Sequence, residues 1–243
     1  MACEHSQACL DTVVAKTGPY EERGGWTVIN DKKTCQLSPQ PLFIQRAPSY
    51  LIADITGPKT ADRAILYIYD VFSFQPQSLQ GADILAYSSS KPCLVVMVDW
   101  FKGGAVQHEW ITSKKEEDRK LMYQFLETTA SPVNVLPSVF EFLAESKEIF
   151  PNVKRWGSVG FCWGGKLVSL VSAKGDASPL VAAAQSSPAR MDPEEAKKVI
   201  IPMAILASAK EDASVVKQYG ENLRGEKYVE IFGSQVHGWM SAR

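Results

Sequence analysis

Short apolar runs alternate with helix-like patterns along most of this chain, and this alternation constrains the fold more than any other feature. The apolar runs are rich in β-branched and aromatic residues and span residues 64–72, 93–101, 155–163, 180–188, 201–209 and 227–235. Parallel strands that are covered on both faces have this continuous apolar character, so we expect each run to form a strand. The last run is more amphipathic, which predicts a position nearer the edge of the sheet.

The intervals between the later runs carry apolar residues at helical spacing. These patterns predict helices over residues 115–129, 134–147, 164–173 and 213–224, with prolines near the boundaries. Strands that alternate with helices are joined by right-handed crossovers into a mostly parallel sheet with helices on both faces. The sequence therefore predicts an α/β fold.

The N-terminal part of the chain differs from the rest. Residues 41–57 suggest one or two antiparallel edge strands, whereas residues 1–40 read as a loop-rich extension. No internal repeat or linker divides the chain beyond residue 40. We therefore expect an extension over residues 1–40 and one α/β domain over residues 41–243.

Composition excludes several classes of protein. A net charge of −1 and an isoelectric point near 6.3 give no indication of a nucleic-acid or membrane-surface partner. The 5 cysteines lie at irregular spacing, which is a poor disulfide framework, and the polar N-terminus does not resemble a secretory signal. We expect free thiols in a reducing cytoplasm.

The sequence Gly-Phe-Cys-Trp-Gly-Gly, residues 160–165, lies where a predicted strand ends and a predicted helix begins. It places Cys162 between Gly160 and Gly164, the pattern of a nucleophile elbow with cysteine in place of serine. Such a turn is strained and brings backbone segments close together, so the flanking residues must lack a Cβ. The N-terminal end of the following helix would favour the thiolate. A buried structural cysteine in a glycine-rich turn is the alternative interpretation.

Acidic and histidine candidates occur in the order that an elbow hydrolase requires, which is nucleophile, acid, histidine. His237 lies after the last predicted strand, and an ordinary turn histidine is the alternative. Glu211 and Asp212 lie just beyond the strand predicted at 201–209. We favour Asp212 over Glu211 as the residue that accepts a hydrogen bond from Nδ1 of His237 and so fixes the tautomer whose Nε2 faces the sulfur.

Together these motifs resemble the dienelactone hydrolase family of α/β-hydrolases (carboxymethylenebutenolidase-like), most closely its fungal-type members. The resemblance covers about residues 40–243. Its motifs are Gly160 to Gly165, Asp212, His237-Gly238-Trp239, YDVF at 69–72 and VDWFKGG at 98–104. It implies an α/β-hydrolase fold with a site at the carboxyl edge of the sheet.

The resemblance also implies roles for individual residues. The backbone N–H groups of Val71 and Trp163 would form the oxyanion hole. Asp70 would modulate the Cys162 thiol, with a capping or turn carboxylate as the alternative. Aromatic side chains at strand ends predict an aromatic-walled, fairly apolar substrate pocket, although such side chains more often belong to the core; those we assign to the pocket are Trp100, Phe101 and Trp239.

This chain also departs from the family pattern. Members that bind dienelactone hold its carboxylate with arginines, one of them four or five residues after the histidine, where this chain has Ser241 and Ala242. Ser73 replaces the glycine that usually follows DVF, and the family's last helix has no counterpart before Arg243. We therefore expect a domain that lacks the last helix and a substrate other than dienelactone.

The sequence predicts a hydrolase that cleaves a small-molecule ester or lactone through a Cys-His-Asp triad and a thioester acyl-enzyme. A non-hydrolytic enzyme or a ligand-binding protein of secondary metabolism on the same fold is the alternative. We expect a monomer or homodimer with no cofactor. We expect no metal either, because Cys3, His5 and Cys9 would supply only three ligands in a polar segment.

Overall fold

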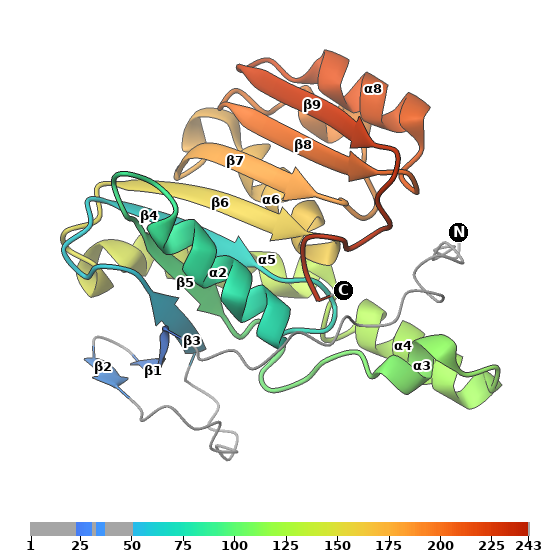
Figure 1. Cartoon of the computed structure of the whole chain (residues 1–243), viewed down its shortest axis with the longest axis horizontal. Helices are drawn as coiled ribbons and strands as arrows, with labels where there is room; N and C mark the ends of the chain where they lie inside the picture. Colours follow the sequence, from blue (N-terminus) through green and yellow to red (C-terminus); the bar gives the residue numbers. More distant parts are fainter. Residues whose placement is uncertain (1–22, 31–32, 37–50, 243) are drawn as a thin grey trace.

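The computed structural model describes residues 23–30, 33–36 and 51–242. Within them, a 9-stranded sheet has the order β2-β1-β3-β5-β4-β6-β7-β8-β9 (Figure 1). Its strands are β1 Gly25–Asn30, β2 Lys33–Gln36, β3 Leu51–Thr56, β4 Arg63–Ile68, β5 Leu94–Val98, β6 Arg155–Phe161, β7 Leu180–Ser186, β8 Met203–Ser208 and β9 Lys227–Phe232. β1, β2 and β3 pair antiparallel, as do β3 and β5, whereas all pairs from β5 through β4 to β9 are parallel.

Helices cover both faces of this sheet. They are α2 Pro76–Tyr87, α3 His108–Thr112, α4 Glu116–Glu127, α5 Pro132–Ile149, α6 Trp163–Ser172, α7 Pro193–Ala196 and α8 Ala213–Asn222, with a 3₁₀ turn at Gly175–Ala177. In Figure 1, α2 lies in front of β4 and β5, while α5 and α6 lie behind the sheet. None of the helices in the described part of the chain combines the length and apolar character needed to span a bilayer.

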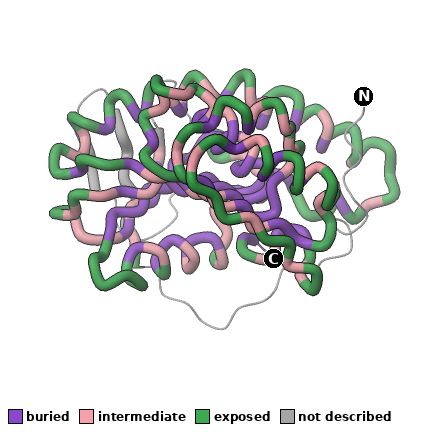
Figure 2. Tube along the Cα trace, turned by 90° about the horizontal axis from the view of Figure 1, so that it is seen from above, coloured by how far each residue is buried: buried purple, intermediate pink, exposed green. Residues whose placement is uncertain are grey.

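The core lies along the central strands, because β4 and β5 have helices on both sides. All five residues of β5 are buried, and so are Leu66, Tyr67 and Ile68 of β4. In Figure 2 the buried trace forms a central band that is enclosed by exposed helices and loops. Since burial of one large aliphatic side chain stabilises a fold by about 1.5–3 kcal/mol, these strands form the stable platform on which the strand-end loops are held.

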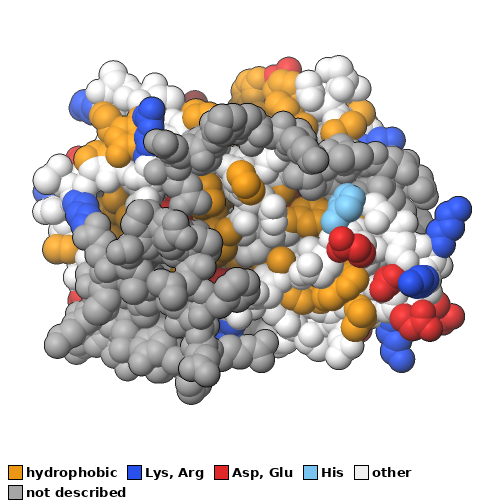
Figure 3. Space-filling model, turned by 60° about the horizontal axis from the view of Figure 1, so that its bottom comes forward, with side chains coloured by type: hydrophobic (Ala, Val, Ile, Leu, Met, Phe, Trp, Pro, Cys, Tyr) orange, Lys and Arg blue, Asp and Glu red, His pale blue; other side chains and the backbone are white. Residues whose placement is uncertain are grey.

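Among the described residues, the face in Figure 3 shows no single-sign charge patch. Acidic and basic side chains lie next to one another at one end of that face, and apolar side chains lie nearer its middle.

The strands and helices expected from residue 64 onward are confirmed, and β9 lies at an edge of the sheet as predicted. The expected α/β fold is therefore correct. The sequence patterns did not reveal α2, because its buried face consists mainly of small or polar residues, namely Ser78, Leu79, Ala82, Asp83 and Ala86.

The N-terminal expectations need correction in two places. β3 is antiparallel as predicted, but it is not an edge strand, because β1 pairs with its outer side. β1 and β2 also form a hairpin within residues 1–40, where we expected loops. Residues 1–22 and 37–50 lie outside the described residues.

Candidate active site

Cys162 occupies the turn between β6 and α6 in a backbone conformation that non-glycine residues rarely adopt. Its φ is 51° and its ψ is −109°, which places it at the N-cap of α6. A conformation of this kind costs about 1–3 kcal/mol and persists only where the surrounding structure enforces it. Here the Cys162 N–H donates to the Ser186 carbonyl at 3.1 Å, and the Cys162 carbonyl accepts from the Ala189 N–H at 2.9 Å. Strand β7 and the loop after it therefore hold the turn in place.

The flanking glycines have the steric role that the sequence predicted. A Cβ at Gly160 would lie 2.3 Å from the carbonyl oxygen of Gly164. A Cβ at Gly164 would lie 2.1 Å from the carbonyl oxygen of Ile68, on the neighbouring strand β4. Both contacts are with backbone, which cannot move aside as a flexible side chain could. The elbow therefore packs directly against the end of β4.

His237 lies in the loop after β9 and is oriented by Glu211. Nδ1 of His237 is 2.6 Å from Oε1 of Glu211, and both side chains are largely buried. The other carboxylate oxygen of Glu211 accepts the backbone N–H of Ser208 at the end of β8. Burial by itself would raise the pKa of Glu211, but the hydrogen bond and charge of His237, together with the Ser208 N–H, outweigh burial and lower that pKa. Glu211 is therefore an ionised acceptor that fixes the imidazole ring.

The prediction that Asp212 accepts the hydrogen bond from His237 is wrong. Asp212 is the N-cap of α8, and its Oδ1 accepts from the N–H of Ser214 at 2.8 Å and from that of Val215 at 3.3 Å. These bonds satisfy N–H groups that the first turn of a helix leaves without intrahelical partners. The hydroxyl of Ser214, which also donates to Oδ1, and these two N–H groups lower the pKa of the exposed Asp212 carboxyl. Asp212 thus caps helix α8, whereas its neighbour Glu211 forms the hydrogen bond with His237.

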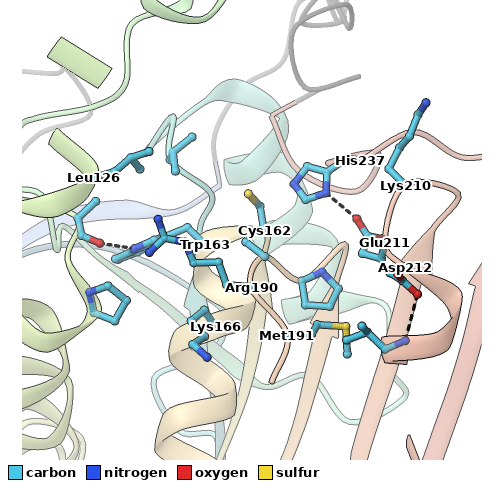
Figure 4. A pocket seen from close by; sticks show the side chains of 16 residues that line it. Leu126, Cys162, Trp163, Lys166, Arg190, Met191, Lys210, Glu211, Asp212 and His237 are labelled. Carbon is cyan, nitrogen blue, oxygen red and sulfur yellow. Dashed lines mark hydrogen bonds and ion pairs between the residues drawn. The ribbon is translucent and has the colours of Figure 1, made fainter. Parts of the chain in front are cut away.

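Cys162, Glu211 and His237 all border one cavity of about 250 Å³, which we call the Cys162 pocket. Figure 4 shows the sulfur of Cys162 beside the imidazole of His237, with Glu211 on the far side of that ring. Further residues line the pocket from the elbow, the α4–α5 region, the loop after β7 and the start of α8; they are Val71, Leu126, Ala130, Pro132, Trp163, Lys166, Pro188, Ala189, Arg190, Met191, Lys210, Asp212 and Val215. The walls are mostly apolar, with cationic side chains among them.

Trp163 is the first residue of α6 and ties two pocket walls together. Its indole Nε1 donates to the carbonyl of Ala130, between α4 and α5, at 2.6 Å. As the first helical residue it also has a backbone N–H with no intrahelical acceptor. Val71, the other predicted oxyanion donor, lines the same pocket from the turn after β4. The structure therefore brings both predicted donors to the pocket that contains Cys162.

The three predicted aromatic wall residues are not among the residues that line this pocket, which corrects that part of the prediction. Trp100 packs edge-on against Phe142, with ring centroids 6.2 Å apart, in the core behind β5. Phe101 packs against Trp163 at 4.5 Å and so supports the wall from behind. Trp239 packs on Phe232 of β9 at 5.0 Å. Trp100 and Phe101 are buried core residues, whereas Trp239 is half-buried beside the edge strand.

The side chains that do form the apolar wall could not be identified from strand-end motifs. Leu126 lies on α4, Pro132 begins α5, and Met191 follows β7. These residues are far from Cys162 in the sequence, and only the folded chain brings them to the same pocket. The loop after β7 lines the pocket and contains two strained residues, Ser187 with φ 43° and Arg190 with φ 49°. Neither residue is a glycine, so the sequence does not indicate that the backbone has a positive φ there.

Asp70 follows β4 and is buried, with 2% of its surface exposed. Its carboxylate accepts hydrogen bonds from the N–H of Phe72, the hydroxyl of Ser241 and the N–H of Ala242. This agrees with the alternative that it is a turn carboxylate, while its effect on the thiol stays a prediction. Ser73, which replaces the usual glycine, has a φ of 63° and so keeps the backbone conformation that glycine would adopt easily.

No group of three or more potential metal ligands comes together among the described residues. Cys3, His5 and Cys9 lie outside them, as does Arg243.

One protein family and two relatives match most of this chain. The dienelactone hydrolase family matches residues 54–237. Two uncharacterized AIM2 family proteins of Schizosaccharomyces pombe are similar to the chain. One is 30% identical over 195 residues, covering 78% of this chain and 76% of the relative. The other is 28% identical over 193 residues, covering 77% and 75%.

A solved structure shows the same fold. The dienelactone hydrolase from Anabaena variabilis has a TM-score of 0.59 at 13% identity, over 79% of this chain and 84% of that chain. At that identity the likeness concerns the fold alone. The sequence match covers most of the chain, including the elbow, Glu211 and His237. The chain therefore belongs to the dienelactone hydrolase family and has the α/β-hydrolase fold.

Proposed function

We propose that this protein hydrolyses a small ester or lactone through a thioester acyl-enzyme, with Cys162 as the nucleophile, His237 as the general acid and base, and Glu211 as the residue that orients His237. One observation carries the proposal: the 2.6 Å hydrogen bond between Glu211 and His237 borders the same pocket as the strained Cys162 turn. A base that is oriented by a third group beside a nucleophile is the arrangement that activates a thiol for acyl transfer.

The acylation step moves one proton twice. Nε2 of His237 takes the proton of the Cys162 thiol, and the sulfur forms a bond to the carbonyl carbon. The tetrahedral intermediate places negative charge on the former carbonyl oxygen, near the N–H groups of Val71 and Trp163. His237 then gives its proton to the leaving alkoxide as the C–O bond breaks. A thioester and an alcohol result.

Deacylation takes the same path with water. His237 removes a proton from water, and the resulting hydroxide attacks the thioester carbonyl. The C–S bond breaks, the sulfur regains a proton from His237, and the carboxylic acid leaves. With a lactone, the alcohol stays attached to the acyl group and can attack the thioester again, so water must be held closer to the carbonyl than that alcohol.

The pocket indicates the kind of substrate that fits. At about 250 Å³ it admits a small molecule. Leu126, Pro132 and Met191 provide apolar contacts, and Glu211 is already engaged with His237. These features favour a compact, largely apolar acyl group or alcohol.

A panel of activated aryl esters and small lactones tests the proposal. Turnover by the wild-type protein should be lost in Cys162→Ala and in His237→Ala. Cys93→Ala is the matched control, because Cys93, directly before β5, is another free, buried cysteine, and burial raises the pKa of its thiol. That variant should keep wild-type turnover.

The opposite results would overturn the proposal. Turnover that survives in Cys162→Ala would exclude this cysteine as the nucleophile. A folded wild-type protein that turns over none of the esters or lactones, yet binds them, would instead favour a ligand-binding function.

A further inference from the structure

Asp70 contacts two separate parts of the proposed site, although no step of the proposed reaction uses it. It lies at the end of β4, whereas His237 lies beyond β9, and three strands separate β4 from β9 in the sheet. Its buried carboxyl group requires hydrogen-bond donors, because a buried polar group is costly unless it is hydrogen-bonded.

One carboxylate oxygen closes the turn that carries Val71. Oδ1 accepts the N–H of Phe72 at 2.9 Å, and the backbone carbonyl of Asp70 accepts the N–H of Ser73 at 3.1 Å. On the other side, the carbonyl of Val71 accepts the N–H of Val106 at 2.9 Å. The peptide group before Val71, whose N–H is the proposed oxyanion donor, is thus fixed from both directions.

The other oxygen holds the segment that carries His237. Oδ2 accepts the hydroxyl of Ser241 at 2.7 Å and the N–H of Ala242 at 3.2 Å. The N–H of Ser241 in turn donates to the carbonyl of Gly238, the residue directly after His237, at 3.0 Å. Hydrogen bonds to a carboxylate are stronger than those between neutral groups, so this contact restrains the chain strongly.

We propose that Asp70 is a positioning residue that couples the oxyanion-hole turn to the histidine segment, with Ser241 as its partner. The inference rests on the proposed function, because it assigns Val71 and His237 their roles there. It differs from direct modulation of the Cys162 thiol, because the coupling acts through Ser241 and Ala242. Substitution of Ser241 should therefore have much the same effect as substitution of Asp70.

Three variants test the coupling: Asp70→Asn, Ser241→Ala and the double variant. A fourth variant, Asp83→Asn, is the control. Asp83 is the matched control, since it is a buried carboxylate that accepts from Thr56 and from the backbone of Arg23, and it does not line the Cys162 pocket. Steady-state kinetics with an aryl ester should be expressed per titrated Cys162 thiol, so that loss of folded protein does not count as loss of rate.

We expect Asp70→Asn to lower kcat by about tenfold or more with KM little changed, because misplacement of catalytic groups acts on the transition state. Ser241→Ala should lower kcat in the same direction. The double variant should be no worse than Asp70→Asn, since the two residues act as one unit. Asp83→Asn should keep the wild-type kcat per titrated thiol.

Alkylation of Cys162 by iodoacetamide separates this role from direct modulation of the thiol. The coupling predicts that Ser241→Ala and Asp70→Asn change the alkylation rate in the same direction, because both loosen the segment that carries His237, the base that takes the thiol proton. An altered alkylation rate in Asp70→Asn, with wild-type kcat in Ser241→Ala, would overturn the coupling and favour thiol modulation.

Hydrogen exchange provides a readout that does not depend on turnover. Asp70→Asn and Ser241→Ala should both speed amide exchange at residues 238–242, and Ser241→Ala should also speed it in the turn at 71–73. Unchanged exchange in that turn would contradict the coupling even if the protein hydrolyses no ester. If the wild-type protein shows no turnover but both variants show faster exchange in both segments, the proposed function would be contradicted and the coupling would still stand.

Discussion

Oε1 of Glu211 lies 2.6 Å from Nδ1 of His237, while the carboxylate of the next residue, Asp212, turns away to cap α8. The chain leaves β8 at Ser208, and the Ser208 N–H binds the second oxygen of Glu211. Two adjacent carboxylates therefore have different tasks. One orients a histidine, and the other begins a helix.

Substitution of these two residues should separate the tasks. We predict that Glu211→Gln lowers kcat/KM for an aryl ester by about 10²- to 10⁴-fold, the range typical of general acid–base catalysis, because the histidine loses the acceptor that fixes its tautomer. Asp212→Asn should keep most of that activity, since asparagine remains a good N-cap. Comparable losses in both variants would contradict the assignment of Glu211.

The contact between Glu211 and His237 should also make stability depend on pH. Folding lowers the pKa of Glu211 from its ordinary value of 4.5. The ionised carboxylate therefore stabilises the folded protein fully at pH values above 4.5. That stabilisation is lost as the pH falls through the lower folded value. Urea unfolding should therefore show a destabilisation by Glu211→Gln that is largest near neutral pH and shrinks in acid. A difference in unfolding free energy that is constant with pH would argue against this contribution.

The glycines of the elbow should resist even the smallest side chain. We predict that Gly164→Ala either prevents folding or lowers stability by several kcal/mol, since its Cβ would lie 2.1 Å from the Ile68 carbonyl oxygen. Gly233→Ala is the control, because a Cβ there meets nothing within 4 Å. Thermal unfolding of the two variants measures the difference. A Gly164→Ala protein as stable as Gly233→Ala would show that the elbow can open to accept a side chain.

The hydrogen bond from Trp163 to Ala130 should stabilise the pocket wall. We predict that Trp163→Phe lowers the free energy of unfolding by about 1–3 kcal/mol, because the buried Ala130 carbonyl loses its donor. Trp156→Phe is the matched control, since Nε1 of the buried Trp156 has no hydrogen-bond partner among the described residues. The loss of unfolding free energy in Trp156→Phe should come from packing alone. Equal losses in the two variants would indicate that the Ala130 contact adds little.

The α/β core could be predicted because its strands are covered on both faces. Burial on both sides makes β5 apolar throughout, and that pattern is visible without any knowledge of the neighbours. The opposite holds for α2, whose buried face includes Ser78 and Asp83. These polar side chains are buried because of contacts from other elements, which no local pattern reveals.

The candidate site divides in the same way. The elbow was predictable because Gly160 and Gly164 satisfy a local steric need, and His237 was predictable from its place after the last strand. The choice between Glu211 and Asp212 depends on how the chain turns as it leaves β8, which composition does not encode. The contact from Asp70 to Ser241 joins residues 171 positions apart, and only the folded chain brings them together.

The central claim is that Cys162 carries the acyl group during turnover, and intact-protein mass spectrometry after rapid acid quench tests it most directly. The measurement uses an activated aryl ester whose acyl group has a known mass, mixed with wild-type protein for less than one turnover. We predict one added acyl group on the wild-type protein, located on the peptide that contains Cys162 and released by hydroxylamine, and none on Cys162→Ala. Turnover by the wild-type protein together with an adduct on another residue, or an adduct that persists in Cys162→Ala, would contradict the account.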